Sequence, residues 1–236
     1  MKTLGTKFLL GLLLMLACSI GYAAQDAGFK SLFNGKDLAG WVGKPELWSV
    51  QDGTIQGKTT KENPLKGNTF LVYTNHEVRD FELRLSYKIV GGNSGIQYRS
   101  KVVDSNNWVV AGYQADFEAG KTFSGILYEE RARGILAQRG QKTVIEDDNG
   151  KPKIMVTGTL GKSEDIQAKI KNEDWNDYVV IAKGNHFQHF INGTQTVDVT
   201  DNQEAKAAKS GIVALQLHAG APMTVQFRNI RIKEVK

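Results

Sequence analysis

Strict alternation of apolar and polar side chains is the feature that most restricts the fold of this chain. From Phe81 to Ile89 every odd position is apolar and every even position is polar. This period of two is that of a β-strand with one buried face, because successive side chains of a strand point to opposite sides. The segment is the clearest strand in the sequence.

Shorter runs of the same kind occur along the chain, separated by Gly, Asn and Asp. Asn192-Gly193 is a strong signal for a tight hairpin. Helical periodicity is weak, and only 163–169 and 203–210 are candidates for a short helix. Many strands joined by such turns predict an all-β jelly-roll sandwich of two antiparallel sheets. The runs are Trp48–Val50, Thr54–Gln56, Thr69–Tyr73, Ile96–Arg99, Tyr113–Glu118, Gly125–Tyr128, Asp177–Lys183, His186–Ile191, Gly211–His218 and Thr224–Glu234.

The region 140–172 is polar and charged, with the segment Glu146–Pro152 at its centre. We interpret it as a hairpin with a solvated turn, since it contains no residues for a separate core. Such a hairpin could still overhang a binding cleft.

The first residues predict a secretory signal peptide over 1–23. Lys2 and Lys7 precede an apolar run, and small residues follow up to Ala23. Cleavage there would leave one domain over 24–236, exported to the periplasm or secreted. Leu16-Ala17-Cys18-Ser19 loosely resembles a lipoprotein box, so a membrane partner is expected only if Cys18 is acylated.

Composition narrows the partners and the sources of stability. The formal charge is +5, but lysines are mixed with acidic residues and form no basic run. This pattern predicts a solvated surface and no nucleic-acid partner. Cys18 is the only cysteine, so no intramolecular disulfide can form and stability must come from the core.

A glycine-rich turn, Gly91-Gly92-Asn93-Ser94-Gly95, leads into a strand that carries Gln97 and Arg99. Three glycines in five residues permit a tight bend and a close approach to a ligand. Alternation predicts that Gln97 and Arg99 share one face of that strand.

Two further strands are expected to present polar side chains to the same hollow. In the run that ends at His218, the valine and leucines take one face, leaving Gln216 and His218 on the other. In the run from Tyr113 to Glu118, Gln114 and Asp116 lie on the polar face. Two interpretations of these residues remain open, a binding groove and an ordinary solvent-exposed face. Short amides and one histidine solubilise a sheet poorly, which favours the groove.

Amides and charged groups bind sugar hydroxyls, and aromatic side chains pack against the apolar face of the ring. The best-placed aromatic candidates are Trp108 and Tyr128, which lie in or beside loops and polar runs. A carbohydrate is therefore the expected ligand.

The segment Tyr128-Glu129-Glu130-Arg131-Ala132-Arg133 concentrates two carboxylates and two guanidiniums. An arginine beside a carboxylate keeps it ionised and oriented, as a general base requires. A surface ion-pair cluster would give the same sequence, and both interpretations of Glu129 and Arg133 remain open.

Motifs for other chemistries are missing from the sequence. There is no HxH, HExxH, G-x-S-x-G, P-loop or strand-linked G-x-G-x-x-G motif. No cofactor is therefore indicated. A divalent metal held by Asp116, His218 and a glutamate from separate strands is left open, and its ligands stay unknown.

The sequence also resembles a known family over nearly all of its length. The segments that carry the resemblance are Phe29–Trp41, Trp48–Gly53, Leu215–His218 and Val225–Ile230, in the family's order. They are similar to the 3-keto-disaccharide hydrolase family. The resemblance implies a concanavalin A-like jelly roll with a ligand on its concave sheet, and a glycoside substrate already oxidised at C3.

A ketone at C3 acidifies the hydrogen at C2, so a base can remove it and the group at C1 can be expelled. On this hypothesis His218 or Asp116 is the base and Glu129 the reserve candidate. Arg99, Gln114 and Gln216 would hold the ring and the oxyanion, with Asn93, Trp108, Tyr128 and Arg133 as further substrate contacts. The alternatives are a non-catalytic carbohydrate-binding module and a structural envelope protein.

Overall fold

The computed structural model describes residues 27–235. The predicted signal peptide and Cys18 lie outside the described residues. Export and acylation therefore stay predictions. Within 27–235, no helix is long and apolar enough to cross a membrane.

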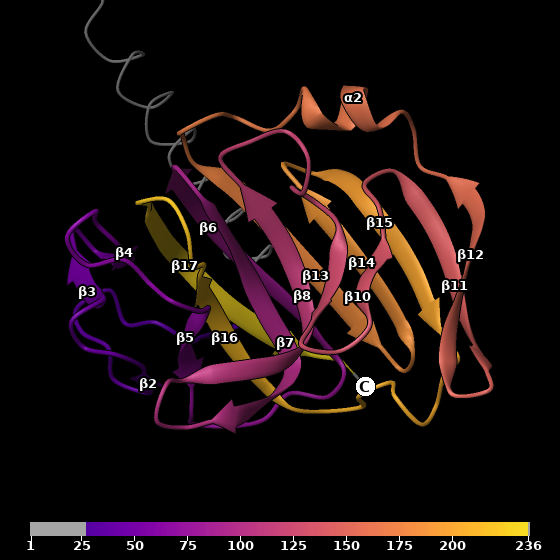
Figure 1. Cartoon of the computed structure of the whole chain (residues 1–236), viewed down its shortest axis with the longest axis horizontal. Helices are drawn as coiled ribbons and strands as arrows, with labels where there is room; N and C mark the ends of the chain where they lie inside the picture. Colours follow the sequence, from indigo (N-terminus) through magenta and orange to yellow (C-terminus); the bar gives the residue numbers. More distant parts are fainter. Residues whose placement is uncertain (1–26, 236) are drawn as a thin grey trace, which may run out of the picture. The chain divides into compact units, whose positions relative to one another are not determined.

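The described chain forms two β-sheets, as predicted (Figure 1). The smaller sheet has the order β10 (Gly134–Ala137), β9 (Leu127–Glu130), β8 (Val109–Glu118), β7 (Asn93–Asp104), β16 (Ile212–Leu217), β5 (Thr69–Tyr73) and β2 (Trp41–Val42). The larger sheet has the order β12 (Lys151–Thr159), β11 (Gln141–Asp148), β15 (Thr194–Asp201), β14 (His186–Ile191), β13 (Asn176–Lys183), β6 (Phe81–Val90), β17 (Thr224–Glu234), β4 (Thr54–Lys58) and β3 (Trp48–Gln51). The two-residue strand β1 (Lys30–Ser31) comes first in the chain.

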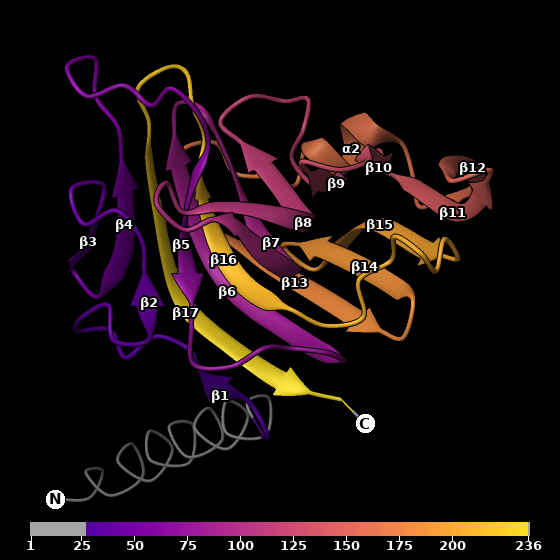
Figure 2. The ribbon, with the colours of Figure 1, turned by 60° about the horizontal axis from the view of Figure 1, so that its bottom comes forward.

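Neighbouring strands are antiparallel, with one exception among those described. Strand β11 runs parallel to β15, with Gln141 opposite Val197. The chain passes from β10 in the smaller sheet to β11 in the larger sheet through only three residues, 138–140. The predicted hairpin at 140–172 is confirmed as β11 and β12, at one end of the larger sheet (Figure 2).

Alternation correctly predicted which side chains enter the core. The odd positions of β6, from Phe81 to Ile89, are buried. Tyr113 and Phe117 of β8 belong to the same core cluster. Trp41 and Trp48 are also core residues. Burial of these apolar faces between two sheets is the main source of stability in a fold of this kind.

Helix is scarce, and only one of the two candidate segments forms a regular helix. The short helix α2 spans Ser163–Gln167. At 203–210 the chain makes only a hydrogen-bonded turn, in which the Ala207 N–H donates to the Gln203 carbonyl (2.9 Å). No amphipathic stripe is available there to stabilise a longer helix by packing.

Candidate functional site

A pocket of about 210 Å³ lies on the outer face of the smaller sheet. Its polar residues come from four strands and two adjoining turns, and its walls include three apolar side chains and one tyrosine. It is lined by Asn68, Asn93, Gln114, Asp116, Phe123, Ile126, Tyr128, Glu130, Ile135, Gln216 and His218. Larger hollows of about 520 and 660 Å³ exist elsewhere. The small pocket is the candidate site because it gathers two buried carboxyls and an imidazole.

Strand register explains this convergence. Gln97 of β7 lies opposite Gln114 of β8, which lies opposite Tyr128 of β9. On the other side, Leu215 of β16 pairs with Ile96 of β7, which places Gln216 one residue further along. Directly opposite residues of neighbouring strands share a face, so these polar side chains form a band across the sheet.

Asp116 is the most strongly perturbed group in the pocket. Its side chain accepts hydrogen bonds from Asn93 Nδ2 (2.7 Å) and Gln114 Nε2 (3.1 Å). The residue is only 6% exposed. Burial raises its pKa to about 7, although the two amide bonds oppose this. Asp116 can therefore exchange a proton near neutral pH.

Glu130 is a second buried carboxyl in the pocket. It accepts hydrogen bonds from Gln216 Nε2 (3.2 Å) and Asn68 Nδ2 (3.3 Å). Burial raises the pKa of Glu130, and the hydrogen bond from the Asn68 amide and the charge of Arg131 oppose the rise. The sequence had indicated its neighbour Glu129 as the reserve base. Glu130 was recognisable because it lies two positions after Tyr128 on the same strand and so shares its face.

His218 follows β16 and lines the pocket beside this carboxyl. Its Nδ1 donates to the carbonyl of Ala219 (2.5 Å). A carbonyl oxygen can only accept, so the proton of the neutral ring is on Nδ1 and Nε2 is the acceptor. The Ala219 N–H in turn donates to Asn68 Oδ1 (3.0 Å), which orients the amide that binds Glu130. Sequence reasoning missed Asn68, which precedes β5 in a turn.

Phe123 supplies an exposed aromatic surface at the pocket, with 40% of its surface accessible. Its loop is fixed by two anchors. Glu118 accepts from the backbone N–H groups of Thr122 (2.5 Å) and Phe123 (2.9 Å). The Arg139 guanidinium donates to the Ser124 carbonyl (2.6 Å). Phe123 lies in a loop, where strand periodicity does not apply, so the sequence did not indicate it.

Trp108 does not line the pocket, so the prediction that it contacts the substrate was wrong. It packs with Phe70, Val72 and Val110 in a separate apolar cluster. Its backbone has a positive φ of 51° at the turn before β8. This conformation, unusual for a bulky residue, could not be read from strand periodicity.

Arg99 also lies elsewhere, so the expectation that it shares a face with Gln97 was wrong. A bulge in β7 falls between Tyr98 and Lys101, and Arg99 has a φ of 45°. The bulge interrupts the alternation. The guanidinium instead donates to the carbonyls of Arg79 and Gly184 (both 2.6 Å) and pairs with Asp80 (2.8 Å).

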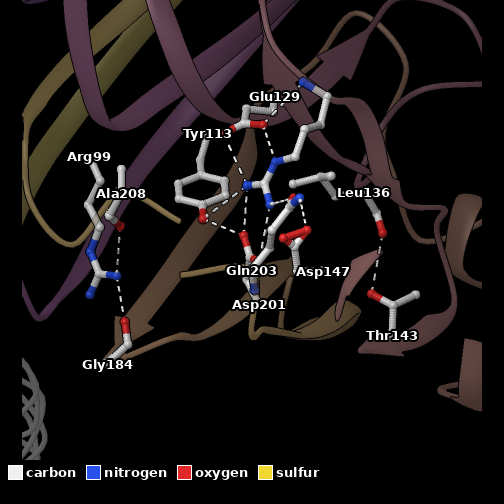
Figure 3. A network of polar contacts seen from close by, with 11 residues as sticks. Arg99, Tyr113, Glu129, Leu136, Thr143, Asp147, Gly184, Asp201, Gln203 and Ala208 are labelled. Atoms are coloured by element: carbon white, nitrogen blue, oxygen red, sulfur yellow. Dashed lines mark hydrogen bonds and ion pairs between the residues drawn. The ribbon is translucent and has the colours of Figure 1, made fainter. Parts of the chain in front are cut away.

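Glu129 and Arg133 belong to a buried ion cluster on the core side of the sheet, not to the pocket (Figure 3). Arg133 binds both oxygens of Glu129 (2.5 and 3.1 Å) and both oxygens of Asp201 (3.0 and 2.7 Å). Tyr113 donates to Asp201 Oδ2 (2.6 Å), and Gln203 accepts from Arg133 (3.2 Å). Neither the general-base nor the surface-cluster interpretation was right.

The Arg133 guanidinium is a permanent positive charge at the centre of this cluster. Burial alone would lower the pKa of Arg133, but its hydrogen bonds to Glu129 and Asp201 prevail and raise it. Bidentate pairs of this geometry are strong and directional. The cluster therefore holds β9, the following turn and the end of β15 together.

A metal centre finds no support in the described part of the chain. No group of three or more His, Cys, Asp or Glu side chains in 27–235 is arranged to hold an ion. Asp116, Glu130 and His218 line one pocket, but their hydrogen-bond partners are amides and a backbone carbonyl. The set of Asp116, His218 and a glutamate considered in the sequence analysis is thus not gathered as a ligand set.

Comparison with known proteins agrees with this architecture. The sequence model of the 3-keto-alpha-glucoside-1,2-lyase-like domain matches residues 28–233. No curated protein matches the chain. Among solved structures, a putative glycosyl hydrolase from Parabacteroides distasonis is 20% identical, with a TM-score of 0.58 over 90% of this chain and 96% of that one.

Two other similar structures bear on the fold. The carbohydrate-binding module CBM66 from Bacillus subtilis is 16% identical, with a TM-score of 0.51 over 86% of this chain and 99% of that one. A protein with a galectin-like fold from Bacillus subtilis is 10% identical, with a TM-score of 0.56 over 87% and 94%. At these identities the likeness concerns the fold, and it confirms the predicted jelly-roll class.

Proposed function

This chain belongs to the family of 3-keto-alpha-glucoside-1,2-lyase-like domains, and we propose that it cleaves glycosides that carry a ketone at C3 of the sugar. The observation that carries the proposal is the Asp116 carboxyl. It is buried, is held by two amides, has a pKa raised to about 7 by that burial, and lies in a pocket with a second carboxyl and an imidazole. A base with a pKa near the working pH is well suited to proton abstraction.

The reaction begins at C2, whose hydrogen is acidified by the adjacent ketone. Asp116 takes this proton, and the C2–H electron pair forms the enolate with the C3 oxygen. The enolate then expels the group at C1, which breaks the C1–O bond, leaves a C1=C2 double bond and restores the ketone. Water can add to C1 with return of a proton to C2, which gives net hydrolysis.

Glu130 and His218 are placed for the leaving group. Burial raises the pKa of Glu130, which favours its protonated form as a donor to the departing oxygen. His218 provides an acceptor nitrogen beside it. The amide groups of Asn68, Asn93 and Gln216 each have a second N–H, available to the hydroxyls and the C3 oxyanion.

The pocket suits elimination better than direct displacement at C1. No lysine or arginine lines it within residues 27–235, and burial raises the pKa of Glu130 although the charge of Arg131 opposes this, so the pocket does not favour a permanently ionised nucleophile. Phe123 and Tyr128 offer apolar surface for the sugar ring or the aglycone. An elimination needs one base, one acid and neutral donors, and the pocket has this set.

The decisive assay incubates the purified protein with a 3-keto aryl glucoside in D₂O. The expected result is aglycone release with deuterium at C2 of the recovered sugar, or an unsaturated keto sugar if water does not add. Release without involvement of C2 would contradict the elimination. Intact 3-keto glycoside together with binding of unmodified glycans would identify a carbohydrate-binding module instead.

A matched control is present in the same chain. Asp198 lies on the larger sheet and is bound by Gln188 Nε2, Gln195 Nε2 and His186. Its pKa is lowered by these partners although burial opposes this. Asp198→Asn should leave turnover unchanged, whereas Asp116→Asn should reduce it strongly. We further propose that the protein acts after export, on the basis of its predicted leader; detection of the mature chain in periplasmic fractions would test this.

A further inference from the structure

We propose that Gln97, which does not touch the substrate pocket, is a positioning residue that acts through Gln114 to control whether the Asp116 carboxyl keeps its proton. The catalytic meaning of this inference rests on the proposed function, but the hydrogen-bond relay itself does not. Its parts are a row of side chains on β7 and β8: Ser100, Gln97, Gln114 and Asp116.

The first arrangement of the relay suits an ionised Asp116. Gln114 Nε2 donates to Asp116 Oδ2 (3.1 Å), and Gln97 Nε2 donates to Gln114 Oε1 (2.6 Å). Ser100 Oγ completes the row by donating to Gln97 Oε1 (2.7 Å). Every donor then points toward the carboxylate.

The second arrangement reverses the Gln97 amide. Its nitrogen then donates to the backbone carbonyls of Tyr113 (3.1 Å) and Gly112 (3.3 Å) and to Ser100 Oγ (2.7 Å). Its oxygen faces the Gln114 amide at 2.6 Å. Gln114 must turn its NH₂ group to that oxygen, so its own oxygen lies 3.1 Å from Asp116 Oδ2. Two oxygens at this distance form a hydrogen bond only if the carboxyl carries a proton.

The two arrangements differ in how well they satisfy Gln97. This residue is fully buried, and in the first arrangement its oxygen faces two backbone carbonyl oxygens. In the second arrangement both carbonyls receive a hydrogen bond. A buried hydrogen-bond acceptor that faces only other acceptors destabilises the fold. The surroundings of Gln97 therefore favour the arrangement in which Asp116 is protonated, and this outweighs the long bond from Gln114 Nε2 to Gln216 Oε1 (3.5 Å) that exists only in the first arrangement. On this proposal Gln97 makes Asp116 a stronger base.

Two glycines make room for the relay. A Cβ atom at Gly95 would overlap the Gln114 side chain, and one at Gly112 would overlap Ser100 Oγ. Gly112 also has a φ of 141°, which other residues rarely adopt. The glycine-rich turn noted in the sequence thus serves the side chains beside it.

Other groups also face Asp116, so the test must not alter them. Glu118 and Glu130 favour its protonated form through their charge, and Asn93 favours the ionised form. His218 and Tyr128 line the same pocket. Gln97 and Ser100 are neutral residues that do not contact the carboxyl, so substitutions there leave these groups in place; Ser100→Ala also removes the bonds of its hydroxyl to the Tyr98 and Tyr113 carbonyls (3.0 and 3.4 Å).

The experiment follows the Asp116 carboxyl by ¹³C NMR titration in the substrate-free protein. Gln97→Met removes the preference for the protonated arrangement and should lower the Asp116 pKa by about one unit. Ser100→Ala removes the hydroxyl that Gln97 Oε1 needs in the ionised arrangement, and should raise the pKa by roughly half a unit. Ser94→Ala, which alters a buried serine of the same strand that donates to the Gln216 carbonyl (2.7 Å), should leave it unchanged.

Opposite shifts in the two variants would support the relay, because general loosening of the fold would move both in one direction. Shifts of the same sign, or none, would overturn it. Should Gln97→Met fail to fold, neutron structures of the wild-type protein at acid and alkaline pH would decide, since the Gln97 amide must reverse between them. The titration needs no substrate, so expected shifts without cleavage of 3-keto glycosides would reject the proposed function and keep the relay.

Discussion

The molecule contains two buried carboxylate clusters that are stabilised in opposite ways. In the pocket, Asp116 and Glu130 are bound by neutral amides, and burial raises their pKa values. In the ion cluster, Glu129 and Asp201 are bound on both oxygens by one arginine. Glu129 and Glu130 are consecutive residues of β9, so the alternation of one strand separates the two environments.

The comparison shows that the partner, more than burial, decides what a carboxyl can do. An amide satisfies a carboxyl in either protonation state, because it offers both a donor and an acceptor. A guanidinium has only donors, so it fixes the ionised form. A site for proton transfer requires the first kind of partner, and a rigid structural joint is better served by the second.

The largest expected effect is on turnover, when the proton acceptor is removed from the pocket. Asp116→Asn should reduce turnover of a 3-keto aryl glucoside about 1,000-fold, the usual scale for a lost general base. The free energy of unfolding at pH 8 should not fall, since the substitution removes a buried charge. Turnover above one tenth of the wild-type value would remove Asp116 from the mechanism.

Substitutions in the ion cluster should change the free energy of unfolding more than turnover. Arg133→Met leaves the Glu129 and Asp201 charges without their counter-ion and should lower the free energy of unfolding by about 3–5 kcal/mol, measured by urea denaturation. Turnover per folded molecule should change little. The triple variant Arg133→Met/Glu129→Gln/Asp201→Asn should recover part of the loss, and no recovery would argue against an electrostatic origin.

The Asp116 carboxyl of the pocket should also make the free energy of unfolding depend on pH. Asp116 holds its proton up to about pH 7 in the folded protein, whereas in the unfolded chain it releases it near pH 4. The folded state therefore binds more protons between these values. The contribution is fully present below about pH 4 and is lost as the pH rises through 7, by roughly 2–4 kcal/mol in total. Urea denaturation at several pH values should show this decline, and Asp116→Asn should flatten it; an unchanged slope would contradict the assignment.

The smallest effect concerns the apolar wall of the pocket. Phe123→Ala should raise KM for a 3-keto aryl glucoside about 3–10-fold with little change in kcat, because it removes contact surface without touching the reacting atoms. Phe123→Tyr keeps the ring and serves as the control. An equal loss in both variants would indicate a disturbed loop in place of a lost contact.

Periodicity predicted the strands and the faces of β6, β8 and β16, and so placed Gln114, Asp116, Gln216 and His218 together. It failed where the backbone departs from a regular strand. The bulge in β7 turned Arg99 away from the pocket. Alternation along β9 puts Glu129 on the face opposite Tyr128 and Glu130, but its burial with Arg133 and Asp201 depends on a contact between residues far apart in the sequence. Asn68 and Phe123 lie in turns, where no period applies and position depends on tertiary contacts.

The space at Gly95 has a consequence for how this chain can vary. The Gln114 side chain occupies the volume that a methyl group on residue 95 would need. A replacement of Gly95 by alanine is therefore expected to be tolerated only with a shorter residue at 114. A side chain at position 95 is therefore expected only in homologues that have a residue shorter than glutamine at position 114.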